Sequence, residues 1–124
     1  MNPTKSLYEQ LGGEEMVAKT VAIFYRKVLA DPLLRPFFEG MDLSRIEAMQ
    51  RAFLVTVFGG PNAYSGRDMG RAHARLVQHG LGDAHFTAVV NHLDTTLAEL
   101  NVNKPLRDWA RALTEAMRKD ILGR

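Results

Sequence analysis

Glycine and proline residues interrupt this chain along its length, and nearly every stretch between two interruptions has the hydrophobic periodicity of an amphipathic helix. The interruptions lie at Gly12-Gly13, Pro32, Gly40, Gly59-Gly60-Pro61, Gly66, Gly80 and Pro105. No stretch alternates between apolar and polar residues as a β-strand does. We therefore predict an all-α fold with four substantial helices and two or three short ones.

Capping residues and apolar stripes locate the predicted helices. We expect them over residues 14–30, after Asp31-Pro32, from Asp42, over 68–78, over 83–100, and from Asn103 through Ile121. Gly80 should end the helix over 68–78, and Asp83 should cap the helix that follows. The helix over 68–78 is expected to turn an apolar face inward, made of Met69, Ala72, Leu76 and Val77.

Length and composition exclude several classes of protein. The chain has 124 residues, 46% of them hydrophobic, which suits a single domain over residues 1–124 with one core. The absence of cysteine excludes disulfide scaffolds, thiolate zinc sites and cysteine nucleophiles, and it fits a cytoplasmic protein. The net charge is only +2, with acidic residues among the basic ones, so we expect no nucleic-acid partner. No apolar run is long enough to span a bilayer, so we expect no membrane partner.

Three polar side chains fall on or beside apolar stripes. His73 lies between Ala72 and Leu76 on its predicted helix, Gln50 shares a stripe with Phe53, and Tyr25 follows Phe24. Burial of an unsatisfied amide or imidazole costs about 1–3 kcal/mol, so such residues need a partner. Each of them is either a core group that finds a partner within the protein or part of a binding site.

The spacing of residues in the sequence excludes several other kinds of site. No glutamate is followed by histidine three residues later, which excludes a di-iron carboxylate bundle. His85 and His92 are two helical turns apart, too far to share one metal ion, and we interpret them as flanking residues. The glycine pairs lack the residues that complete a phosphate-binding loop, a dinucleotide fingerprint or a nucleophile elbow. Hydrolase and nucleotide-binding functions therefore have no support.

Several short motifs nevertheless occur in a characteristic order. They are Leu7 to Gly13 (LYEQLGG), Phe24-Tyr25 followed by Val28-Leu29, Phe37-Phe38, Gln50 with Phe53, Phe58-Gly59-Gly60, and Met69 with Ala72-His73. Together they resemble the group I truncated haemoglobins, from Leu7 through the last helix. The resemblance implies a two-over-two helical sandwich around haem b.

The resemblance also implies roles for individual residues. The proximal iron ligand would be His73, a neutral imidazole oriented by a hydrogen bond from its other nitrogen. On the distal side, Tyr25 and Gln50 would hydrogen-bond each other and the O₂ ligand. The ring of Phe38 would pack on the haem face. Further haem contacts are expected from Arg45, Ile46, Met49, Phe53, Tyr64, Met69 and Phe86, with Arg45 and Tyr64 near the propionates.

The chain departs from the family pattern at four points. Ile46 stands where many globins have a distal histidine or glutamine, which leaves Tyr25 and Gln50 as the donors. Met49 replaces the histidine that serves some relatives as a sixth iron ligand, and we interpret it as apolar lining. The last helix has no histidine, which argues against covalent haem attachment. Leu54 replaces a phenylalanine proposed to gate a gas tunnel, so tunnel gating is not carried over.

Three functions remain open at this level. The resemblance favours a monomeric haem protein that binds O₂ reversibly, binds NO and CO, and oxidises nitric oxide to nitrate with electrons from a separate reductase. Storage, delivery or sensing of O₂ without turnover would use the same residues. The third alternative is a cofactor-free helical interaction module in which His73, Gln50 and Tyr25 are satisfied core groups.

Overall fold

The computed structural model describes residues 6–61 and 66–124, and every regular element within these ranges is helical. The elements are α1 (Leu7–Leu11), α2 (Gly13–Ala30), the 3-10 helix η1 (Arg35–Phe38), α3 (Leu43–Phe58), α4 (Gly66–Gln78), α5 (Asp83–Glu99), α6 (Lys104–Ala116) and α7 (Arg118–Leu122). No strand occurs in the described part of the chain, so the predicted all-α class is confirmed.

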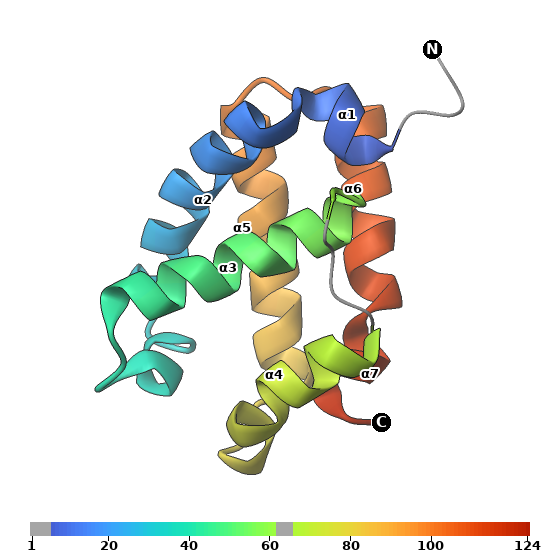
Figure 1. The fold of residues 1–124 in the computed structure, drawn as a ribbon. Helices are drawn as coiled ribbons and strands as arrows, with labels where there is room; N and C mark the ends of the chain where they lie inside the picture. Colours follow the sequence, from blue (N-terminus) through green and yellow to red (C-terminus); the bar gives the residue numbers. More distant parts are fainter. Residues whose placement is uncertain (1–5, 62–65) are drawn as a thin grey trace.

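Two pairs of long helices form the body of the molecule (Figure 1). Helix α2 packs against α3, and α5 packs against α6; the pairs meet where α2 contacts α5 and where α3 contacts α6. This is the predicted two-over-two sandwich. Helices α4 and α7 lie together at the end of the sandwich opposite α1 (Figure 1).

Capping residues fix several helix starts as the sequence predicts. The Asp42 carboxylate accepts from the backbone N–H of Ser44, and the Asn103 side chain accepts from Leu106 N, which satisfies donors in the first turns of α3 and α6. The prediction for Asp83 was wrong, because Gly82 is the N-cap and Asp83 is the first residue of α5. A carboxylate in the first turn also complements the helix dipole, so an aspartate near a helix start is expected at either position.

The segment after α2 is less helical than predicted. Asp31 ends α2, and its carboxylate accepts from the N–H of Leu33 at 2.9 Å, which makes a turn rather than a helix start. Helical geometry resumes only at Arg35, as the single 3-10 turn η1. Leu33 consequently remains exposed.

The last predicted helix is also interrupted. It breaks at Met117 into α6 and the five-residue α7, whose Ile121 and Leu122 are buried. On α4, Ala72 is exposed, so the predicted apolar face is narrower and consists of Met69, Leu76 and Val77 beside His73. Periodicity alone did not predict the break at Met117, and it did not predict that Ala72 would be exposed.

One apolar core holds the helices together. It includes Phe24 of α2, Leu54 of α3, Leu97 of α5 and Leu122 of α7, each less than a tenth exposed. Complete burial of one such side chain contributes about 1.5–3 kcal/mol. Within residues 6–61 and 66–124, none of the helices is both long enough and apolar enough to cross a membrane.

Candidate functional site

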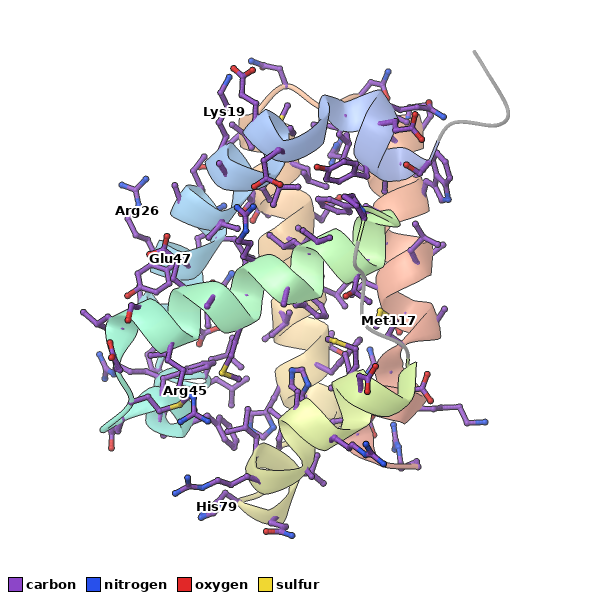
Figure 2. All side chains as sticks on the ribbon, in the orientation of Figure 1. Lys19, Arg26, Arg45, Glu47, His79 and Met117 are labelled. Carbon is purple, nitrogen blue, oxygen red and sulfur yellow. The ribbon has the colours of Figure 1, made fainter. Side chains whose placement is uncertain are left out.

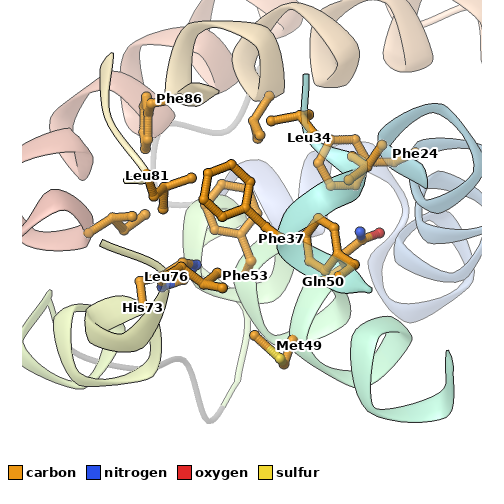
Figure 3. Close-up of a pocket in the computed structure, with 14 residues that line it drawn as sticks. Phe24, Leu34, Phe37, Met49, Gln50, Phe53, His73, Leu76, Leu81 and Phe86 are labelled. Atoms are coloured by element: carbon orange, nitrogen blue, oxygen red, sulfur yellow. The ribbon is translucent and has the colours of Figure 1, made fainter. Parts of the chain in front are cut away.

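A pocket opens between the two helix pairs and α4. It comprises about 680 Å³ of space between the side chains, part of it open to solvent. The described residues that line it are Phe24, Val28, Leu34, Phe37, Phe38, Met49, Gln50, Phe53, His73, Leu76, Leu81, Phe86, Val89 and Ile121 (Figure 3). Twelve of these fourteen side chains are apolar, so the two polar ones, Gln50 and His73, define its chemistry.

His73 enters the pocket from α4 with one ring nitrogen already engaged. Its Nδ1 lies 2.8 Å from the backbone oxygen of Met69, one turn earlier on the same helix. A carbonyl only accepts, so Nδ1 donates, and the neutral ring keeps its lone pair on Nε2. Burial lowers the pKa of the imidazole, against a smaller opposing effect of the Met69 bond. The side chain is thus prepared as a neutral nitrogen ligand.

Gln50 enters from α3, on the other side of the pocket in the view of Figure 3. Its side chain is 7% exposed, and neither its Nε2 nor its Oε1 finds a hydrogen-bond partner within the described part of the chain. An orphaned buried amide costs about 1–3 kcal/mol. A ligand in the pocket that accepts a hydrogen bond would remove this cost.

The polar groups of the pocket do not suit a metal held by side chains alone. Among the described residues, no group of three or more His, Asp or Glu side chains could hold a metal ion. A single imidazole in an apolar pocket instead fits a metal whose other ligands come from the cofactor itself, a large, flat and mostly apolar macrocycle. The residues present therefore fit haem, because they offer an imidazole nitrogen from α4 and an unpaired amide from α3.

The residues singled out from the sequence divide into two sets. Phe38, Met49, Gln50, Phe53, His73 and Phe86 line the pocket. The other set is not part of the lining: Tyr25 is half-buried next to Phe24, Arg45 is exposed on α3 (Figure 2), and Ile46 and Met69 are buried. Met69 acts through its carbonyl on His73. Tyr64 lies outside the described residues.

Sequence reasoning did not assign several of the lining residues to the site. Val28 lies one turn after Phe24, and Leu76 lies three residues after His73, so helical spacing alone could have found them. Phe37 precedes Phe38, and only the second ring of this pair was predicted to contact haem. Ile121 had no local signal, because tertiary packing of α7 brings it to the pocket.

Comparison with known proteins decides the family. A model of the bacterial-like globin family matches residues 6–123. The chain is 39% identical to the group 1 truncated hemoglobin of Tetrahymena pyriformis over the full length of both chains. It is 41% identical to that of Synechocystis, covering 94% of this chain and 97% of the relative. The chain belongs to the group 1 truncated haemoglobins.

Solved structures of truncated haemoglobins superpose closely on this one. A Synechococcus globin whose structure carries a heme modification is 41% identical, with a TM-score of 0.84, and the match covers 97% of this chain and 100% of that one. The Fe(III) form of the Tetrahymena pyriformis protein is 38% identical, with a TM-score of 0.83 and the same coverage. Membership of this truncated haemoglobin family implies a haem protein that binds oxygen.

Proposed function

We propose that this truncated haemoglobin holds haem b without a covalent link, through His73 Nε2, and that Gln50 and Tyr25 are its distal hydrogen-bond donors. The observation that carries the proposal is the buried Gln50 amide, which has no partner in the described chain and lines the same pocket as His73. Tyr25 is half-buried and follows pocket-lining Phe24 on α2, and the resemblance to the family is what assigns its hydroxyl as the second donor.

When bound, haem supplies an iron atom at which O₂, CO and NO bind and at which nitric oxide is oxidised to nitrate. The chain supplies the rest. The bond from His73 to the Met69 carbonyl orients the proximal imidazole. The Gln50 N–H groups would donate to a polarised ligand in the pocket and slow its escape, with less effect on neutral CO. The apolar side chains of the lining would pack against the apolar faces of the bound group.

Sequence observations support the remaining parts of the proposal. Helices α6 and α7 contain no histidine, which favours non-covalent haem, although one related Synechococcus structure has covalently attached heme. No flavin or nicotinamide motif occurs, so turnover with nitric oxide requires a separate reductase. The lack of cysteine favours a cytoplasmic location. We propose that the protein acts there as a monomer.

Haemin titration of the purified protein tests the site directly. The wild-type chain should take up one equivalent with a sharp Soret band, and His73→Ala should lose the proximal ligand and alter the ferrous spectrum. Met49→Leu, on the pocket wall, is the matched control and should leave coordination unchanged. Unchanged iron coordination in His73→Ala would reject His73 as the ligand. A wild-type chain that took up no haemin would favour the cofactor-free interaction module.

The reaction of the oxygenated protein with nitric oxide separates the two haem functions. Rapid formation of nitrate in the presence of a reductant would support nitric oxide oxidation. A slow reaction would leave O₂ storage, delivery or sensing as the function, with the same residues around the ligand.

A further inference from the structure

Helix α4, which carries His73, depends mainly on α7 for its packing within the protein. The contact between α4 and α7 is the most extensive between any two elements of the described chain (Figure 1). The approach is close at Gly70, where an added Cβ would lie 2.8 Å from the backbone oxygen of Asp120. The position of His73 is therefore set by a five-residue helix at the C-terminus.

A helix of five residues is too short to be stable alone, so α7 must itself be held in place. Arg124, at the end of the chain, donates to both carboxylate oxygens of Asp83, at 2.9 and 2.7 Å. Arg118, at the start of α7, donates to Oδ1 of Asp83 at 3.0 Å and to its backbone oxygen at 3.2 Å. Both ends of α7 are thus tied to the first residue of α5.

Arg118 also connects this cluster to the pocket. Its side chain is only 19% exposed and donates to Thr87 of α5 and to Glu115 of α6. Its guanidinium carbon lies 4.6 Å from the centroid of the Phe86 ring, a cation–π distance, and Phe86 lines the pocket. Ile121, between the two arginines, lines the pocket as well.

We propose that Asp83, Arg118 and Arg124 form a C-terminal latch that positions α7 against α4, and through α4 positions His73 and retains the cofactor. The three are positioning residues, since none of them belongs to the pocket lining. The inference rests on the proposed role of His73 as haem ligand. The hydrogen bonds from Arg124 and Arg118 lower the pKa of Asp83, in agreement with a carboxylate that is charged in the latched state.

Arg124→Gln is the sharpest test, because Arg124 is half-exposed and, within the described chain, its guanidinium hydrogen-bonds to Asp83 alone. Hydrogen exchange by mass spectrometry should show faster exchange in α4 and α7, with α2 and α3 unchanged. Arg124→Lys keeps a cation and should restore part of the protection. Lys104→Gln removes an exposed ion pair of α6, to Asp108, at the end of the molecule away from α7, and should leave α4 unchanged.

Cofactor retention supplies the second measurement. At about 10 mM salt, Arg124→Gln should transfer haemin to excess apomyoglobin about two- to fivefold faster than wild type. At about 0.5 M salt the exposed ion pairs are screened, so the wild-type rate should approach that of the variant. The ferrous Fe–His stretching band should shift or broaden in the variant.

The outcomes separate the latch from the proposed function. Unchanged exchange in α4 together with an unchanged haemin transfer rate in Arg124→Gln would overturn the latch. Faster exchange in α4 with unchanged haemin transfer would overturn its role in cofactor retention. If the wild-type chain bound no haemin, the proposed function would fail, and exchange in α4 of the apoprotein would still decide whether the latch positions that helix.

Discussion

Replacement of Gln50 by leucine should stabilise the apoprotein against unfolding and, in the haem-loaded protein, weaken the retention of O₂. In the apoprotein, the Gln50 amide is 7% exposed and neither of its polar atoms is paired within the described chain. Leucine has a similar volume and leaves no polar atom unpaired. Removal of an orphaned buried amide should therefore raise the free energy of unfolding by about 1–2 kcal/mol. For a chain of this length, that corresponds to a rise in Tm of about 4 °C per kcal/mol.

In the haem-loaded protein the same change should remove the proposed hydrogen-bond donor to the ligand. A lost bond of about 1–1.5 kcal/mol corresponds to an O₂ dissociation rate about 5- to 12-fold higher, since 1.4 kcal/mol is a factor of ten. The CO dissociation rate should change much less. Urea unfolding of the apoprotein and stopped-flow displacement of O₂ by CO measure the two effects.

Met49→Leu is the matched control for Gln50→Leu. Met49 lies one residue earlier on α3, lines the same pocket and is apolar before and after the change. Both measurements should stay close to wild type, because swaps that conserve volume usually cost less than about 1.5 kcal/mol. A less stable Gln50→Leu apoprotein with an unchanged O₂ dissociation rate would refute the reasoning and make Gln50 an ordinary core residue.

Three further predictions follow from other parts of the molecule. Tyr25→Phe should raise the O₂ dissociation rate about tenfold through loss of one hydrogen bond, and an unchanged rate in stopped flow would mean that Tyr25 does not face the ligand. Gly70→Ala should destabilise the protein by about 1–2 kcal/mol in urea unfolding, because the new Cβ would meet the Asp120 oxygen at 2.8 Å; a gain in stability would show that α7 yields easily. The hydrogen bond from His92 Nε2 to Asp31, at 2.7 Å, is the main cause of the lowered pKa of Asp31. The contribution of this bond to the free energy of folding is therefore complete above the usual carboxyl pKa of about 3.9 and is lost as the pH falls through the lower pKa of Asp31 in the folded protein. The Tm difference between wild type and Asp31→Asn should consequently shrink below about pH 4.

Local sequence signals predicted the elements whose ends depend on local chemistry. Asp42 and Asn103 cap their helices because a side-chain oxygen reaches the first-turn N–H groups, an interaction within three residues. Gln50 and His73 could also be predicted from local signals, because helical spacing shows which positions face a neighbouring helix and both residues fall on such positions. The resemblance then assigned them roles that spacing alone left open.

Tertiary packing decided the features that local signals missed. The break at Met117 and the contribution of Ile121 to the pocket depend on the contact between α7 and α4, about fifty residues apart in sequence. The role of Asp83 depends on Arg118 and Arg124, which are distant in sequence and reach it only after the chain folds. Periodicity contains no information on such pairs.

The hydrogen bond from His73 Nδ1 to the Met69 carbonyl has a consequence for the electronic character of the proposed site. A neutral carbonyl polarises the imidazole less than a carboxylate would, and a thiolate ligand would donate still more electron density. With His73 as the proposed ligand, the imidazole would exert only a weak electron push toward the iron. A weak push favours reversible binding of an intact diatomic molecule over cleavage of its O–O bond. Substitution of Met69 alone would not change this balance, because the acceptor belongs to the backbone of the helix.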